Sequence, residues 1–228
     1  MSPTFCLLVV AKAPVPGFAK TRLCPPATEQ QAAEIAAAAL LDTLEAVFST
    51  PGAIPMVAMT GHLPGAAKSE EIFHALRSAT VFTQRGWDFS TRLANAHADT
   101  SALHTGMPVV QIGMDTPQVT AEILAAAAEP LLHGGHEAVL GPAEDGGWWA
   151  LGLRDPRQAG VLSEVPMSRE DTGELTLRAL AGGGLKVQPL TILSDVDTML
   201  DARRVAKLRP GGRFAAAVTA VRGQDTAA

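Results

Sequence analysis

Phe5-Cys-Leu-Leu-Val-Val-Ala11 runs directly into Lys12-Ala-Pro-Val-Pro-Gly-Phe-Ala-Lys-Thr-Arg-Leu23 near the start of the chain. The first seven residues form a short apolar run, which is typical of a buried strand. The loop after it carries Lys12, Lys20 and Arg22 and contains no carboxylate. Cations gathered at the end of a first strand suit a phosphate-bearing ligand, so these three are the candidate catalytic residues. In the simpler interpretation they are solvated loop charges, and the prolines merely stiffen a turn.

Length and composition limit the class of protein. With 228 residues, of which 47% are hydrophobic, the chain can build one large core. We expect one domain over residues 1–222 and a flexible tail over 223–228. The 18 basic and 23 acidic residues give a net charge of −5, which offers no broad basic face for nucleic acid.

Cysteine content and the first apolar run bear on location. Cys6 and Cys24 are the only cysteines, so neither a disulfide framework nor a CxxC site is available. The apolar run has seven residues and no cationic segment before it, too little for a signal peptide or a membrane span. The sequence therefore predicts a cytoplasmic protein with no membrane partner, a monomer or a homodimer.

Apolar runs of strand length alternate with Ala/Leu-rich segments of helical period, which is typical of a parallel sheet covered by helices on both faces. The predicted strands are residues 5–11, 54–60, 79–83, 107–113, 137–141, 148–153 and 185–191. The predicted helices are residues 31–48, 66–77, 90–103, 119–132, 171–181 and 198–208. Thr28 and Gln31 have the spacing of a capping box at the first helix. The expected fold is an α/β protein, a three-layer α/β/α sandwich with a mixed, mostly parallel sheet.

Ligands of open parallel sheets sit beyond the carboxyl ends of the strands, and three such ends carry charged motifs. One is Gly113-Met-Asp115-Thr-Pro117, where Asp115 follows a predicted strand and Pro117 suits the first turn of the next helix. A carboxylate at this place is a natural ligand for Mg²⁺, which takes one or two protein carboxylates, waters and substrate phosphates. The alternative is that Asp115 caps a helix or closes a turn.

Two aspartates follow the last predicted strand in Ser194-Asp-Val-Asp-Thr198. In an extended segment Asp195 and Asp197 are two residues apart and face the same way, so both can point at one cation. Asp197 also has the position of an N-cap for the helix predicted over 198–208. The two roles are compatible.

The third charged loop is Gly141-Pro-Ala-Glu-Asp-Gly-Gly-Trp-Trp149. Paired glycines let the backbone approach a ligand closely, and tryptophans at a strand start can form the wall of an acceptor pocket. A β-turn with both tryptophans in the core is equally compatible. The candidate acceptor-binding residues are Glu144, Asp145, Gly146, Gly147, Trp148 and Arg169.

Other chemistries lack support in the sequence. The first loop is not a P-loop, because Pro14 and Ala19 stand where glycines are needed. His133-Gly-Gly-His136 is more typical of a helix end than of a metal-ligand pair. There is no G-x-S-x-G elbow and no tyrosine, so acyl-hydrolase chemistry has no candidate residues.

Three motifs in this order, Lys12–Leu23, Gly113–Pro117 and Gly141–Trp148, resemble a bacterial family of glycosyltransferase-A-like proteins. Its members, also described as radical-SAM/selenodomain-associated transferases, show K-A-P-x-P-G-x-x-K-T-R-L, G-x-D-[ST]-P and G-P-A-x-D-G-G-[YW]. The family lies in the nucleotide-diphospho-sugar transferase superfamily, so the resemblance implies the glycosyltransferase-A fold. The first loop is also similar to phospholactate guanylyltransferases, and the aspartate motifs resemble molybdenum-cofactor and sugar-acid nucleotidyltransferases.

These resemblances imply transfer of a nucleotidyl group from an NTP, of CTP or GTP type, to a small phosphate- or phosphonate-bearing acceptor with release of pyrophosphate. They imply Mg²⁺, or Mn²⁺ in its place, held by Asp115 and Asp197, with the cations of the first loop on the triphosphate. The spacing of the last aspartate motif adds Asp195 as a candidate metal ligand. The expected nucleotide-binding residues are Ala11, Pro14, Gly17, Gln84, Gly86, Arg92 and Met114. One alternative is a glycosyltransferase with a nucleotide-sugar donor, although the D-x-D motif of many such enzymes is missing at Asp115. Another is a non-catalytic nucleotide-binding module.

Overall fold

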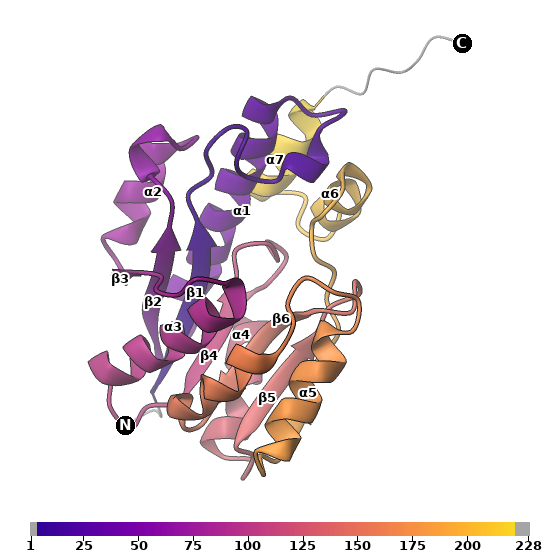
Figure 1. Cartoon of the computed structure of the whole chain (residues 1–228). Helices are drawn as coiled ribbons and strands as arrows, with labels where there is room; N and C mark the ends of the chain where they lie inside the picture. The colour runs from indigo at the N-terminus through magenta and orange to yellow at the C-terminus, as the bar shows by residue number, and fades with distance from the viewer. Residues whose placement is uncertain (1–3, 222–228) are drawn as a thin grey trace.

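The computed structural model describes residues 4–221, and its frame is one seven-stranded sheet flanked by helices (Figure 1). The strand order is β3-β2-β1-β4-β6-β5-β7. Strand β6 is antiparallel to β4 and β5, and the other pairings are parallel. The mixed, mostly parallel sheet is thus confirmed. The tail predicted over 223–228 lies outside the described residues.

The strands agree with the sequence prediction to within a few residues. They are β1 (Phe5–Lys12), β2 (Ala53–Thr60), β3 (Thr80–Thr83), β4 (Val109–Gly113), β5 (Ala138–Pro142), β6 (Trp148–Leu153) and β7 (Val187–Pro189). The last is shorter than the predicted 185–191. It is an edge strand that pairs with β5 alone, so it has backbone hydrogen bonds to a neighbouring strand on one side only.

The α-helices are α1 (Glu29–Phe48), α2 (Ser69–Leu76), α3 (Phe89–Leu103), α4 (Ala121–Leu132), α5 (Thr172–Gly182), α6 (Met199–Ala206) and α7 (Arg213–Ala220). Three 3₁₀ segments join them, namely η1 (Thr21–Leu23), η2 (Leu63–Gly65) and η3 (Pro156–Glu164). The capping box of Thr28 and Gln31 is confirmed at α1. The sequence prediction missed α7 and all three 3₁₀ segments.

Two predictions about helix starts were wrong. Helix α4 is capped by Thr120, whose side chain accepts from the Ile123 backbone N–H, so Pro117 lies in the preceding loop and not in the first turn. Helix α6 is capped by Thr198 in a capping box with Asp201, so Asp197 is not its N-cap. Thr198 caps the helix instead of Asp197 because its hydroxyl bonds both the backbone N–H and the carboxylate of Asp201, three residues on.

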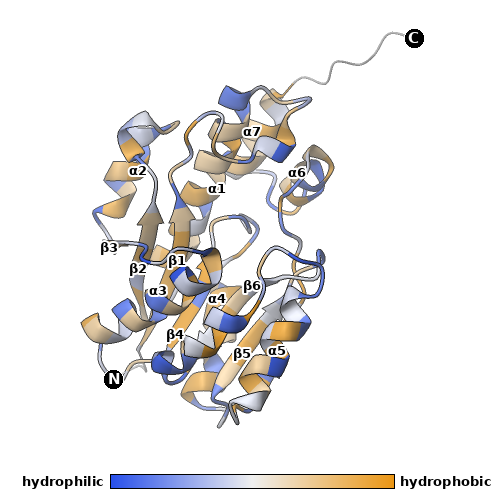
Figure 2. Ribbon diagram, in the orientation of Figure 1, coloured by the Kyte–Doolittle hydropathy of each residue, from blue (hydrophilic) through white to orange (hydrophobic). Residues whose placement is uncertain are grey.

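Side chains on the two faces of the sheet enter separate core clusters. Along β1, Leu7 and Val9 pack on one side with residues of α1, α2 and α4. Leu8 and Val10 pack on the other side with residues of α3, η3 and α5. Figure 2 shows the resulting hydrophobic strands between the helices. Burial on both faces explains the continuous apolar run of the first strand, because no face of β1 meets water.

A third cluster lies beyond the carboxyl end of β1, where α6 and α7 join α1 (Figure 1). It contains Leu23 of η1, Val196, and Phe214 of α7, all buried. The cluster fixes both the loop after β1 and the segment that carries Asp195 and Asp197. Packing therefore brings together two segments that are distant in sequence.

No helix in residues 4–221 combines the length and the apolar character needed to cross a bilayer.

His97 of α3 is fully buried, and neither ring nitrogen has a hydrogen-bond partner among the described residues. Burial lowers the pKa of His97 from 6.5 to about 3. Below pH 6.5 His97 therefore binds a proton in the unfolded chain but stays neutral in the native state, so the free energy of unfolding falls as the pH decreases. Over the first two pH units below 6.5 we expect this residue to cost about 2 to 3 kcal/mol of unfolding free energy.

Urea unfolding of the wild type and His97→Leu at both ends of that interval checks the expectation. The wild type should lose more stability than the variant by about that amount. Equal losses in the two proteins would show that His97 is not held neutral by the fold.

Candidate functional site

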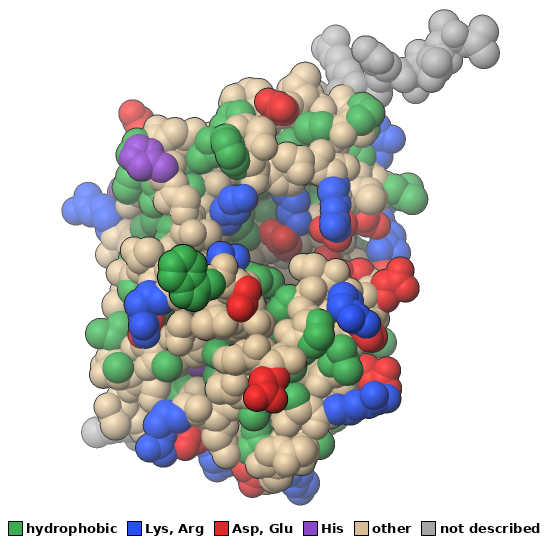
Figure 3. Space-filling view, in the orientation of Figure 1, with side chains coloured by type: hydrophobic (Ala, Val, Ile, Leu, Met, Phe, Trp, Pro, Cys, Tyr) green, Lys and Arg blue, Asp and Glu red, His purple; other side chains and the backbone are tan. Residues whose placement is uncertain are grey.

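A large cavity opens at the carboxyl ends of β1 and β4, with a volume of about 1120 Å³. Figure 3 shows it as a hollow across the middle of this face, with acidic and basic side chains gathered at its border. Its walls come from the β1 loop, the start of α3, the loop after β4, the loop before β6 and the segment before α6. This is the place where ligands bind in open α/β sheets.

Lys20 is the central cation of the cavity. Its Nζ lies 2.7 Å from Asp115 Oδ2 and 3.7 Å from Asp197 Oδ1, and it donates to the Val196 carbonyl at 2.5 Å. The lysine side chain is only 11% exposed. Burial by itself lowers the pKa of Lys20, but the charges of Asp115, Asp197 and Asp195 outweigh it and raise the pKa, so the ammonium stays charged.

The other two cations of the first loop differ in their partners. Arg22 is largely exposed, and its Nη1 donates to Asp197 Oδ2 at 3.0 Å. Lys12 Nζ donates to the Phe18 carbonyl at 2.7 Å and forms no ion pair within the described residues. All three predicted catalytic side chains line the cavity, and two of them already hold an aspartate.

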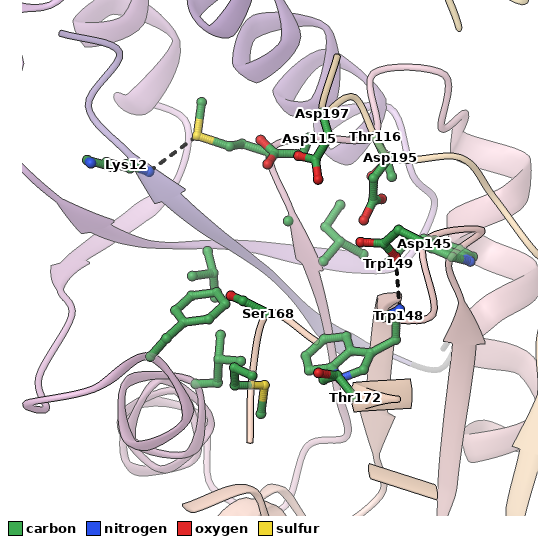
Figure 4. Close-up of a pocket in the computed structure, with 18 of the residues that line it drawn as sticks. Lys12, Asp115, Thr116, Asp145, Trp148, Trp149, Ser168, Thr172, Asp195 and Asp197 are labelled. Atoms are coloured by element: carbon green, nitrogen blue, oxygen red, sulfur yellow. Dashed lines mark hydrogen bonds between the residues drawn. The ribbon is translucent and has the colours of Figure 1, made fainter. Parts of the chain in front are cut away.

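Asp195 faces a different neighbour from Asp197. Figure 4 shows Asp197 beside Asp115, whereas Asp195 points toward Asp145. The pKa of Asp195 is raised to about 7, first by burial and then by the like charges of Asp145 and Asp115. Val196 between the two aspartates is buried in the third core cluster, which turns its neighbours toward the cavity. Both aspartates line the cavity, but they point toward different neighbours, so the expectation that both point at one cation stays a prediction.

The loop before β6 is braced by the first turn of α5 and by the loop that precedes it. The Gly173 backbone N–H donates to the Gly146 carbonyl at 2.8 Å. Gly146 has φ +88°, and a Cβ there would lie 1.8 Å from the Glu170 carbonyl oxygen, so only glycine fits. Asp145 accepts from the Gly147 N–H at 2.8 Å, and Glu144 bonds Arg204 of α6 at 2.5 Å. The loop is thus held in place rather than free to swing.

The sequence left open whether the two tryptophans form the wall of an acceptor pocket or lie in the core. Trp149 is buried in the core and donates to the Thr191 carbonyl at 2.9 Å. Trp148 is partly buried, lines the cavity, and donates to Thr176 Oγ1 at 3.2 Å. Arg169 also lines the cavity, with its guanidinium on Asp171 at 2.8 Å. Trp149 also lines the cavity but is only 3% exposed, so Trp148 is the more exposed of the two residues in this wall.

Only some of the predicted nucleotide-binding residues line the cavity. Four of them line the cavity, namely Ala11, Gln84, Arg92 and Met114, whereas three do not, namely Pro14, Gly17 and Gly86. The Gln84 amide nitrogen donates to the carbonyls of Ala11 and Ala58, so it ties strand ends together. Arg92 lies over the Phe89 ring, and its Nε has no hydrogen-bond partner among the described residues.

Several lining residues were missed by the sequence prediction. Phe89, Leu93 and Met167 form an apolar part of the cavity wall. Gln111 of β4 is 1% exposed, lines the cavity, and leaves Oε1 without a partner in residues 4–221. A glutamine inside an otherwise apolar strand was the available signal, because a buried amide normally has hydrogen-bond partners.

The carboxylates can be tested for their fit to a divalent cation. Within the described residues, no group of three or more His, Cys, Asp or Glu side chains is arranged to hold a metal. Asp115 and Asp197 nevertheless converge on one positive charge, the Lys20 ammonium, at 2.7 and 3.7 Å. Since Mg²⁺ commonly uses only one or two protein carboxylates, this pair fits such a cation once the ammonium moves.

Sequence comparison identifies the family. The family described as "Uncharacterized protein conserved in bacteria (DUF2064)" matches residues 43–169, more than half of the chain. The chain belongs to this family. No curated protein matches the sequence of this DUF2064 protein.

Solved structures give the fold class of the DUF2064 protein. A Desulfovibrio desulfuricans G20 protein, provisionally described as a nucleotide-diphospho-sugar transferase, is 26% identical with a TM-score of 0.78, over 96% of this chain and 98% of its own. A CMP:2-keto-3-deoxy-manno-octonic acid synthetase in complex with CTP is 10% identical, with a TM-score of 0.55 over 91% and 99%. A 4-diphosphocytidyl-2C-methyl-D-erythritol synthase is 14% identical, with a TM-score of 0.55 over 91% and 99%. The DUF2064 protein has the nucleotide-diphospho-sugar transferase fold.

Proposed function

We propose that this protein is a Mg²⁺-dependent nucleotidyltransferase that moves an NMP group from an NTP to a small anionic acceptor. The observation that carries the proposal is the convergence of Lys20, Asp115 and Asp197, from three distant segments, in one cavity at the ligand-binding end of the sheet. The structural likeness to transferases that handle nucleotides supports the same reaction class. The radical-SAM-associated and phospholactate guanylyltransferase-like resemblances agree with this class.

In the proposed reaction an acceptor oxygen attacks the α-phosphorus of the NTP. The bond from that phosphorus to the oxygen bridging to the β-phosphate breaks, and pyrophosphate leaves with the bonding electrons. Phosphoryl-type transfer needs little covalent help, so the protein acts by positioning and by charge neutralisation. Lys12, Lys20 and Arg22 are the proposed partners of the phosphate oxygens, because all three line the cavity on one side.

The proposed ligands of the divalent cation are Asp115 and Asp197, with Asp195 beside them. When bound, such a cation neutralises phosphate oxygens and the charge that develops on the leaving group. The residues of this chain hold the carboxylates ready for it: the third core cluster fixes the segment of Asp195 and Asp197, and the end of β4 fixes Asp115.

The acceptor is proposed to lie between the loop of Glu144 to Trp148 and Arg169. Trp148 presents an aromatic surface there, and Arg169 adds a cation on the same wall. The brace between Gly146 and Gly173 keeps this wall at a fixed place relative to Asp145. A small acceptor that carries a phosphate or a phosphonate matches the cations of the cavity.

Glycosyl transfer from a nucleotide-sugar is the second candidate. It is favoured by the Desulfovibrio desulfuricans protein, whose description names that class and whose fold covers nearly the whole chain. The same cavity would then hold a nucleoside diphosphate as the leaving group. The two reactions differ in which bond breaks, so their products separate them.

A two-stage experiment tests the proposal. Thermal shifts with the four NTPs and with UDP- and GDP-sugars, each with Mg²⁺, identify the donor, since a ligand that binds the folded state raises its melting temperature. That donor is then incubated with a set of phosphate- and phosphonate-bearing acceptors. Nucleotidyl transfer predicts an NTP as donor and pyrophosphate as product. Release of a nucleoside diphosphate from a nucleotide-sugar would establish the second candidate instead, and nucleotide binding indifferent to Mg²⁺ and to Asp115→Ala would indicate a non-catalytic module.

A further inference from the structure

Two cations of the cavity, Lys20 and Arg22, pair with two of its carboxylates in this structure. Lys20 Nζ bridges Asp115 at 2.7 Å and Asp197 at 3.7 Å, while Arg22 bonds the other oxygen of Asp197 at 3.0 Å. The Val196 carbonyl adds a third oxygen to the surroundings of the ammonium, at 2.5 Å. The lysine is thus surrounded by oxygen atoms, as a bound metal ion would be.

From this geometry we infer that Lys20 is an internal cation that occupies the metal-binding carboxylates until a polyphosphate draws it away, so that polyphosphate and metal bind cooperatively. This inference rests on the proposed roles of Lys20, Asp115 and Asp197. Lys20 cannot contact a phosphate fully while its ammonium is held by Asp115, and a divalent cation cannot sit between the aspartates while the ammonium is there. Each ligand removes the obstacle to the other.

Burial and backbone geometry define the position of the Lys20 ammonium among the aspartates. The Lys20 side chain is 11% exposed, whereas that of Asp115 is 43% exposed, so the ammonium is shielded from water while the carboxylate stays open to an incoming cation. Its backbone has φ 49°, in the left-handed region that non-glycine residues seldom adopt, which aims the side chain across the cavity from the start of η1. By linkage, any gain in metal affinity caused by the polyphosphate equals the gain in polyphosphate affinity caused by the metal.

Mn²⁺ binding without nucleotide tests the inference, by electron paramagnetic resonance of the free ion. Lys20→Met should bind Mn²⁺ at least about tenfold more tightly than the wild type, because Asp115 and Asp197 Oδ1 lose their ammonium partner, while Arg22 still bonds Asp197 Oδ2. Lys12→Met is the matched control: Lys12 also lines the cavity but bonds a carbonyl rather than a carboxylate, so its loss should change Mn²⁺ affinity by no more than about twofold. An equal gain in Mn²⁺ affinity in both variants would show that only the loss of a positive charge matters, and it would overturn the inference. The absence of any gain in Lys20→Met would also overturn it.

The reciprocal experiment uses inorganic tripolyphosphate in EDTA, followed by calorimetry, and it decides the question if Lys20→Met does not fold. Asp115→Asn should bind metal-free tripolyphosphate several-fold more tightly than the wild type, since Lys20 is released. Glu170→Gln, which removes a carboxylate that lines the cavity and makes no ion pair in the described residues, should have a smaller effect. Equal effects of the two variants would overturn the inference.

Neither measurement involves turnover, so its outcome is separable from that of the proposed function. If Lys20→Met binds Mn²⁺ tightly but the wild type transfers no nucleotidyl group, the inference about Lys20 stands and the nucleotidyltransferase proposal is rejected. If the wild type transfers a nucleotidyl group but Lys20→Met binds Mn²⁺ no more tightly than the wild type, the proposed function stands and the internal cation is rejected.

Discussion

Asp115→Asn should lower the rate of nucleotidyl transfer by about a thousandfold, the largest effect we expect of any single substitution in the cavity. The change keeps the shape of the side chain but removes the negative charge that would hold a divalent cation at the end of β4. The same carboxylate is the nearest charged partner of Lys20, at 2.7 Å, so its loss also weakens the hold on the ammonium. The measurement is pyrophosphate release with the donor and acceptor identified as described above.

Glu129→Gln is the matched control for the charge. Glu129 is an exposed carboxylate of α4 that bonds His133, and it does not line the cavity. This variant should keep the wild-type rate. If Asp115→Asn also kept it, Asp115 would have no part in the reaction, and the proposed metal pair would be wrong.

Lys20→Met should reduce turnover by about a hundredfold, as is typical for the loss of one preorganised charge donor. The lysine is the only cation of the first loop that is both mostly buried and aimed at the aspartates, so neither Lys12 nor Arg22 can replace it. The loss should appear in kcat, because the phosphate charge that Lys20 neutralises grows as the leaving group departs. Steady-state kinetics at saturating nucleotide measure it.

Lys68→Met is a close control for the backbone as well as for the charge. Lys68 has φ 51° and pairs with Glu71, so it shares the left-handed conformation and the ion pair of Lys20 but lies at the start of α2, away from the cavity. Lys68→Met should leave turnover unchanged. A near-wild-type rate for Lys20→Met would remove Lys20 from the mechanism.

The sequence revealed those parts of the fold and the site that depend on local pattern. The buried run of β1 and the cations after it are contiguous, and the capping box of Thr28 and Gln31 is complete within four residues. The carboxyl ends of β1 and β4 could be placed together, because neighbouring parallel strands end at the same edge of a sheet.

What the sequence could not reveal depends on tertiary packing. The sharing of one ammonium by Asp115 and Asp197 requires the third core cluster, which joins η1, α6 and α7, and α7 was not predicted. With eight residues α7 is too short to be stable by itself, and its burial against α1 fixes it. The apolar wall of Phe89, Leu93 and Met167 likewise comes from segments whose neighbourhood only the folded chain defines.

The most direct test of the account is a crystal structure of the protein with a non-hydrolysable NTP analogue and Mn²⁺, using the anomalous signal of the metal. The account predicts a peak at bonding distance from the carboxylates of Asp115 and Asp197, with Lys20 Nζ moved from Asp115 onto a phosphate oxygen. Bound nucleotide with no metal peak between these residues, and with Lys20 still on Asp115, would contradict it.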